Sequence, residues 1–350
     1  MAAGLAHAPL EGMPHTQPAL WAAIIVAGCA GLSALSVFVL RPLLVRYLLA
    51  HPNARSSHTL ATPQGAGLAV IVSVLAGSGL GLLAWTHGGE PSLIPVLAAA
   101  LALAIVGALD DAHALPVSWR LVGQALAALV MVACLPSELR LLPGLLPLSV
   151  ERVLMVVGTI WFVNAVNFLD GLDWMTVAQA VPMTLGIAIL HFLGGVPDTV
   201  GLLALALLGA MLGFAIFNKH PAQVFLGDAG SLPIGLLLAF MLIVVAGIDL
   251  AAALLLSLYT LSDTTLTLFH RMAAKQPIFS AHRTHFYQRA VAQGFSVPQV
   301  TARIFLLELV LAILAVGAAH ARSTAIDLVA LGLGAFATGV TLWRLAWGPK

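Results

Sequence analysis

Charged residues are scarce in this 350-residue chain: 8% are Asp, Glu, Lys or Arg, whereas 61% are apolar. A soluble protein of this length would carry about 25% charged residues, so the composition excludes a soluble globular protein and gives nucleic acid no basic surface to bind. Cysteine is also scarce. Cys29 and Cys134 are the only two and both lie in apolar stretches, where packing is more common than a disulfide or a metal site.

Long apolar stretches are abundant instead. A helix needs about 20 apolar residues to cross a membrane, and such stretches recur along nearly the whole chain. We therefore predict an all-α, polytopic membrane protein that forms a single domain over residues 1–350. It should have about eleven transmembrane helices, or ten if either of the two weakest segments, 150–166 and 250–269, fails. The expected segments are 20–44, 66–86, 92–109, 119–136, 150–166, 175–194, 199–217, 229–247, 250–269, 302–320 and 324–346.

The charges that remain predict an orientation, because Lys and Arg favour cytoplasmic loops. With the N-terminus in the periplasm, all Lys and Arg except Arg140, Arg152 and Arg322 are cytoplasmic. The inverse orientation reverses this imbalance. The orientation also places five Asp residues in polar motifs on the inner side, so we expect the functional loops to be cytoplasmic.

The first two inner loops contain candidate phosphate-binding and acidic residues. Residues 53–67 carry Arg55 and His58 among turn-forming Pro and Gly, which predicts either a contact to an anionic lipid or substrate or an ordinary solvated loop. The next loop contains Asp110 and Asp111. Adjacent carboxylates repel unless a cation or proton is present, and acids at a membrane edge are functional candidates. Helix capping is the alternative for this pair.

The third loop follows the segment NAVNFLDGLDWMT, residues 164–176. Asn164, Asn167 and Asp170 recur every three residues and form one polar stripe on a helix. Gly171 then permits a break that delivers Asp173 into the loop. Oxygen ligands facing an aqueous cavity suit Mg²⁺, which keeps several positions for phosphate and water. A hydrogen-bond cluster between helices would also explain Asn164, but not the two acids.

The fourth loop, NKHPAQVFLGDAGSLPIG, covers residues 218–235. Gly227 and Gly230 permit close backbone approach to a ligand, and we expect Ser231 to be the N-cap of the eighth helix. A helix N-terminus offers free N–H groups to phosphate. The carboxylate of Asp228 would repel a phosphate bound there unless a metal ion bridged them, so we predict that Asp228 is a Mg²⁺ ligand. The alternative is that this segment forms only a turn and a helix cap.

The longest inner loop, residues 270–302, is predicted to bind substrate. It contains His282, Arg283 and His285, followed by Arg289. These residues form a cationic patch rich in hydrogen-bond donors. A zinc site would require further nitrogen or sulfur ligands, and this loop has no Cys. Phosphate binding is therefore expected.

Together these loops supply oxygen ligands for a hard metal ion, cations for phosphate and an apolar wall. That combination suits a reaction between a water-soluble phosphorylated donor and a lipid phosphate. An ion-coupled transporter is the alternative, since carriers also combine many spans with a few acids; a membrane scaffold is a more distant one. Asp263 and Glu308 fall inside predicted spans and have no assigned role.

Four motifs resemble one known family. They are DD at 110–111, NAVNFLDGLD at 164–173, FLGDAGS at 225–231 and HRTH at 282–285. Their order, and the membrane side on which we expect them, are similar to those of motifs in the polyprenyl-phosphate N-acetylhexosamine-1-phosphate transferases, the bacterial glycosyltransferase family 4. The resemblance extends from about residue 55 to residue 289. PNARSSHTLATPQG and HRTHFYQR resemble the branch that initiates O-antigen and lipopolysaccharide synthesis.

The resemblance implies transfer of a HexNAc-1-phosphate from a UDP-N-acetylhexosamine to undecaprenyl phosphate in the bacterial inner membrane, with release of UMP. The sugar would be GlcNAc or a deoxy derivative such as FucNAc or QuiNAc, and the cofactor Mg²⁺, with Mn²⁺ as a substitute. Membrane lipid surrounds the chain, and a homodimer is one option. The implied roles are metal binding by Asn167 and Asp228, catalysis by Asp110, Asp111, Asp170 and Asp173, and substrate binding by Arg55, His58, Asn164, His282, Arg283 and His285.

The chain departs from the usual family pattern at four positions. Ala61, Gln64 and Ala66 replace Pro, Arg and Gly in the first loop, and Trp174 replaces a Gly after DGLD. Trp174 is expected to reshape the nucleotide pocket. We expect a single in-line displacement by the lipid phosphate; the rival is a two-step reaction with Asp110 or Asp111 as a covalent nucleophile.

Overall fold

The computed structural model describes residues 17–50, 61–85, 93–277 and 282–348, and helices dominate it. Arg55 and His58 lie outside the described residues. The two short strands, β1 (Leu49–Ala50) and β2 (Thr62–Pro63), form one antiparallel pair. The helices are α1 (Gln17–Tyr47), α2 (Gly67–Trp85), α3 (Ile94–His113), α4 (Val117–Ala133), α5 (Leu148–Leu169), α6 (Met175–Phe192), α7 (Asp198–Asn218), α8 (Asp228–Ile248), α9 (Leu250–Ala273), α10 (Phe286–Ala292), α11 (Val297–Ala321) and α12 (Thr324–Trp347).

The helices match the predicted apolar segments closely. Within the described ranges, nine helices are long and apolar enough to cross a membrane, and α2 and α4 contain shorter apolar stretches. Each predicted segment corresponds to one helix, with ends that differ by a few residues. The prediction of a helical, multi-pass membrane protein is confirmed, whereas the number of crossings and the orientation stay predictions. The short helix α10 lies inside the predicted loop 270–302.

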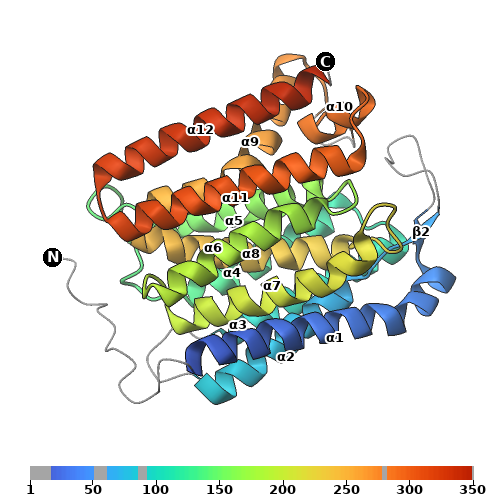
Figure 1. Cartoon of the computed structure of the whole chain (residues 1–350), viewed down its shortest axis with the longest axis horizontal. Helices are drawn as coiled ribbons and strands as arrows, with labels where there is room; N and C mark the ends of the chain where they lie inside the picture. Colours follow the sequence, from blue (N-terminus) through green and yellow to red (C-terminus); the bar gives the residue numbers. More distant parts are fainter. Residues whose placement is uncertain (1–16, 51–60, 86–92, 278–281, 349–350) are drawn as a thin grey trace.

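The helices run side by side along the long axis of the molecule, with α1 and α2 at one edge and α12 at the other (Figure 1). Burial follows this arrangement: 83% of the most apolar stretch of α7 and 78% of that of α8 are buried, against 17% for α1 and 22% for α12. The outer helices expose large apolar side chains such as Phe38 and Phe336. Apolar exposure on this scale suits a lipid environment.

Glycine allows α2 and α3 to contact the start of α8 through backbone atoms. A Cβ added to Gly67 would lie 2.2 Å from the Cα of Gly230, and one added to Gly107 would lie 2.2 Å from the carbonyl oxygen of Asp228. Any side chain would separate these helices. The first turn of α8 is therefore held tightly between α2 and α3.

The connection between α1 and α2 is hydrogen-bonded to the loop that precedes α8. The N–H of Phe225 donates to Pro63, and the N–H groups of Ala66 and Gly67 donate to Phe225 and Leu226, at 2.8–3.1 Å. These bonds bring the first and fourth polar loops to the same end of the bundle.

Two of the three Arg residues predicted at the opposite end have structural partners. Arg140 forms hydrogen bonds of 2.9 and 3.1 Å with the buried carboxylate of Glu151. Arg152 donates to the carbonyls of Leu135, Pro136 and Leu139. Both side chains therefore hold the connection between α4 and α5, which gives a structural reason for these exceptions to the charge pattern.

Candidate active site

A cavity of about 1020 Å³ lies where α3 and α5 end and α8 begins. Its lining brings together acids from three motifs that are far apart in the sequence. Among the described residues, the basic side chains that line the cavity are those of Arg41 in α1 and His220. The polar residues contributed by the predicted motifs are Asp110, Asp111, Asn167, Asp170, Asp173 and Asp228.

Asp111 binds the N-terminus of α8. Its two carboxylate oxygens accept the N–H groups of Asp228 and Ala229 at 2.9 and 3.1 Å, which would otherwise be unpaired in the first turn. Gly227 is the N-cap, with φ +74°, and a Cβ on it would lie 2.4 Å from Asp111 Oδ2. The expectation that Ser231 caps this helix is wrong: Ser231 lies inside α8, and a carboxylate from α3 takes the capping role because Gly227 leaves room for it.

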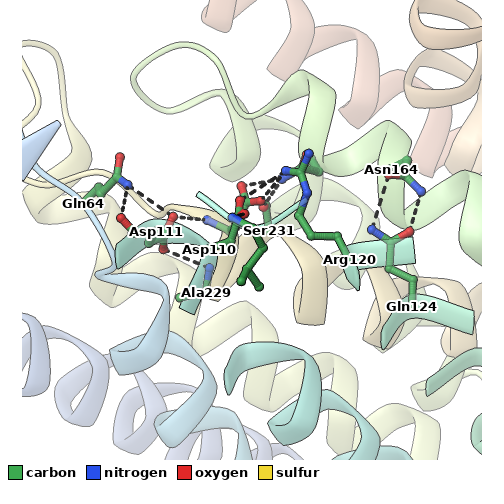
Figure 2. Close-up of polar contacts among 11 residues, drawn as sticks. Gln64, Asp110, Asp111, Arg120, Gln124, Asn164, Ala229 and Ser231 are labelled. Carbon is green, nitrogen blue, oxygen red and sulfur yellow. Dashed lines mark hydrogen bonds and ion pairs between the residues drawn. The ribbon is translucent and has the colours of Figure 1, made fainter. Parts of the chain in front are cut away.

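Arg120 of α4 joins two of the acids. Its Nη1 lies 3.2 Å from Asp110 Oδ2 and 3.1 Å from Asp228 Oδ2, and Figure 2 shows its side chain extending toward Asp110. The other oxygen of Asp110 accepts the N–H of Leu115 at 2.6 Å. Arg120 was not among the residues predicted to form the site. Its position in the helix that directly follows Asp110 and Asp111 could have indicated that it pairs with one of them.

The predicted metal ligands lie in contact. Asn167 Nδ2 donates to Asp228 Oδ1 and to Ser231 Oγ, each at 2.8 Å. Within the described ranges, no group of three or more His, Cys, Asp or Glu side chains could hold a metal ion by itself. Two oxygen-bearing ligands nevertheless fit Mg²⁺, which takes its remaining ligands from phosphate and water. Five Asp residues against a single Arg in the lining also favour a divalent cation.

Asp170 and Asp173 occupy the turn after α5. Asp170 follows the last residue of α5 and accepts a hydrogen bond from Thr176. Burial raises the pKa of Asp170 to about 7, the Thr176 hydroxyl opposes this shift, and the Asp228 carboxylate adds to it. Asp173 Oδ2 lies 2.6 Å from His220 Nδ1 and accepts the N–H of Ala222 at 3.1 Å. It therefore joins the third loop to the fourth.

The comparisons with known proteins agree with this geometry. Residues 93–246 match the model of glycosyl transferase family 4. The decaprenyl-phosphate N-acetylglucosaminephosphotransferase of Mycobacterium leprae is 30% identical, over 85% of this chain and 84% of that protein. The chain belongs to the polyprenyl-phosphate N-acetylhexosamine-1-phosphate transferase family. The transferase is also 26% identical to a probable undecaprenyl-phosphate N-acetylglucosaminyl 1-phosphate transferase of Bacillus subtilis, over 81% of this chain and 82% of that protein.

A relative that is named for a different activity shows how broad this similarity is. The phospho-N-acetylmuramoyl-pentapeptide-transferase of Lactiplantibacillus plantarum is 30% identical, over 62% of this chain and 73% of that protein. Sequence similarity therefore shows a transferase family without identifying one sugar.

Asn164 of the transferase contacts a neighbouring helix and not the cavity. Asn164 Nδ2 donates to Gln124 Oε1 and to the carbonyl of Ile160, and Gln124 Nε2 donates back to Asn164 Oδ1 at 3.3 Å. The two amides face each other, away from Asp111 (Figure 2). This arrangement favours the interhelical alternative over the substrate-binding role that was predicted for Asn164.

The predicted donor-binding residues His282, Arg283 and His285 do not line the cavity. His285 is buried and stacks on His282, with ring centroids 5.0 Å apart, whereas Arg283 is exposed. Burial, followed by electrostatic interaction with His285 and Arg271, lowers the pKa of His282 to about 4. The positive charge of the predicted patch therefore rests on its Arg residues, and phosphate binding by this segment stays a prediction.

The unusual Trp174 adopts a left-handed backbone conformation, with φ +64°. This conformation is costly for residues other than glycine. Its N–H donates to Asn218 Oδ1 and its Nε1 donates to the carbonyl of Ala215, both at 2.7 Å. Trp174 therefore holds Asn218, which lines the cavity, but is not itself among the lining residues.

Proposed function

We propose that the protein transfers a HexNAc-1-phosphate from a UDP-N-acetylhexosamine to undecaprenyl phosphate, with release of UMP. The observation that carries this proposal is the convergence of three remote acidic motifs on one cavity at one end of a membrane-type helical bundle. Two relatives are named for undecaprenyl phosphate and decaprenyl phosphate, which supports a polyprenyl phosphate acceptor. An ion-coupled transporter is less well supported, because these acids lie at helix ends.

The proposal places the protein in the bacterial inner membrane with its N-terminus in the periplasm. The distribution of Lys and Arg favours a cytoplasmic cavity, where a UDP-sugar would have access. A role in O-antigen or lipopolysaccharide synthesis stays a prediction of the sequence resemblance, since the relatives include proteins named for other glycan precursors.

Asn167 and Asp228 would hold Mg²⁺, and Mn²⁺ could replace it. When bound, the ion would neutralise charge on the phosphates. Arg120 already pairs with Asp110 and Asp228, so it would limit repulsion between these carboxylates and an anionic substrate. Asp170 and Asp173, which line the same cavity, would support the nucleotide.

The contacts of the Asp pair favour a single in-line displacement. Both oxygens of Asp111 accept backbone N–H groups of α8. Those of Asp110 contact Leu115 and Arg120. A carboxylate that attacked phosphorus would lose its negative charge and so weaken these hydrogen bonds, whereas a lipid phosphate is already anionic near neutral pH. The two-step rival predicts a phosphorylated enzyme when donor is added without lipid acceptor.

Purified protein with Mg²⁺ and a panel of UDP-sugars tests the proposal by the release of UMP. We expect UMP only when undecaprenyl phosphate is present and only with an N-acetylhexosamine donor. Asp228→Asn should abolish release, whereas Asp249→Asn, the same substitution at the opposite end of α8, should not. Failure of the wild-type protein across the whole panel would refute the proposed reaction.

A further inference from the structure

A second buried carboxylate lies outside the cavity and has a dense set of partners. Asp263 is a residue of α9 with no exposed surface. Its oxygens accept hydrogen bonds from the hydroxyls of Tyr259 and Thr267 at 3.1 and 3.3 Å. These two partners belong to its own helix. A charged group is rarely buried in a membrane helix without a function or a compensating network.

The remaining partners of Asp263 belong to the segment that begins α10. Asp263 Oδ1 lies 3.1 Å from Nδ1 of the buried His285 and accepts the N–H of Phe286 at 3.1 Å. Asp263 Oδ2 accepts the N–H of Tyr287 at 3.4 Å. One carboxylate therefore orients the imidazole of His285 and binds the first turn of α10, which has no side-chain cap of its own.

The same segment contacts the end of α5, where the cavity begins. The buried Tyr287 donates its hydroxyl to the carbonyl of Phe168 at 2.9 Å. A Cβ on Gly171 would lie 2.1 Å from that hydroxyl oxygen, so Tyr287 occupies the space beside the turn that carries Asp170. The next residue, Gln288, lines the cavity.

We propose that Asp263 is a positioning residue that holds the segment 282–288 against the end of α5 in the geometry needed to bind the sugar-nucleotide donor. The proposal rests on the proposed function, since it assigns this segment to the donor. Asp263 itself touches no substrate and acts through His285 and the first turn of α10. No other described carboxylate accepts from the segment 285–287.

Asp263→Asn is the test variant, because the amide keeps one acceptor oxygen and turns an NH₂ donor toward groups that are themselves donors. We expect the KM for the UDP-sugar to rise about tenfold, the cost of a small misplacement of binding groups, while the KM for undecaprenyl phosphate stays nearly unchanged. The peptide that contains Phe286 and Tyr287 should exchange its amide hydrogens faster in the variant, because one of these two N–H groups then faces the new NH₂ group and loses its acceptor.

Glu308→Gln is the matched control. Glu308 is a buried acidic residue of the neighbouring helix α11, and its Oε1 has no hydrogen-bond partner among the described residues. The same chemical change there should alter neither the donor KM nor the exchange of the 286–287 peptide. An equal loss of affinity for donor and lipid in Asp263→Asn, or unchanged donor KM and exchange, would overturn the proposal.

The hydrogen-exchange measurement needs no turnover and so separates the two proposals. A wild-type protein that releases no UMP would refute the proposed function, while the exchange comparison would still decide whether Asp263 holds the segment. If Asp263→Asn fails to fold, Tyr287→Phe decides instead, because it removes only the hydroxyl that binds Phe168. We then expect a selective rise in the donor KM of about threefold, the size of one neutral hydrogen bond, and an unchanged donor KM would overturn the proposal.

Discussion

Replacing Gly107 by Ala should disrupt the site without touching any predicted substrate group. Gly107 lies in α3, one turn before the Asp pair, and an added Cβ would lie 2.2 Å from the carbonyl oxygen of Asp228 and 2.5 Å from the N of Ala229. Ordinary van der Waals contact begins at 3.4 Å. Both neighbours are backbone atoms of α8, so the two helices would have to separate by about 1 Å.

That separation should break the capping contacts of Asp111 with α8, which are 2.9 and 3.1 Å long. A misplacement of about 1 Å can reduce the rate about 100-fold, and we expect a loss of that order in UMP release. Gly158→Ala in α5 is the control, since a Cβ there meets nothing within 4 Å. A Gly107→Ala protein that keeps about a third or more of wild-type activity would refute the claim that backbone contact with α3 sets the position of Asp228.

Three further predictions follow from single contacts. Arg120→Gln should lower the Tm measured in EDTA by a few degrees, because lost hydrogen bonds to charged groups are worth about 1.5–3 kcal/mol. Addition of Mg²⁺ should then raise the Tm of the variant by more than it raises the Tm of the wild type. Asn167→Ala should abolish turnover. Asn164→Ala should keep the donor KM but lower the free energy of unfolding by about 1–3 kcal/mol, because Gln124 loses its partner. Equal kinetic losses in the two variants would contradict this distinction. The pKa of His282 is lowered from 6.5 to about 4 in the folded protein, so between these two pH values the unfolded chain binds a proton more readily. The free energy of unfolding should therefore fall as the pH drops through this range, and unfolding scans of His282→Gln should show a smaller fall in stability than those of the wild type.

The helices and the location of the site follow from local features of the sequence. Apolar length alone predicted each spanning segment, because a helix in lipid must continue for as long as the hydrocarbon does. The distribution of Lys and Arg predicted that the polar loops share one side of the membrane. The i+3 spacing correctly predicted a helix at Asn164 and Asn167, whereas Asp170, the third residue of the expected stripe, follows the last residue of α5.

The contacts made by these residues depend on which helices are neighbours, and the sequence carries little information about that. Asn164 and Asn167 share a face of α5, yet one meets Gln124 of α4 and the other meets Asp228 of α8. Ser231 was predicted to be the N-cap of α8, but Asp111 of α3 accepts the free N–H groups at that end of the helix. Asp263 was conspicuous as an acid in an apolar segment, and only the packing of α10 revealed what it binds.

The central claim is that Asn167 and Asp228 hold one divalent ion in the cavity, and Mn²⁺ binding tests it most directly. Electron paramagnetic resonance with Mn²⁺ and a UDP-N-acetylhexosamine should detect one tightly bound ion per chain in the wild-type protein. Asp228→Asn should lose that ion, whereas Asp249→Asn should keep it. Equal Mn²⁺ binding by the wild-type and Asp228→Asn proteins would contradict the account.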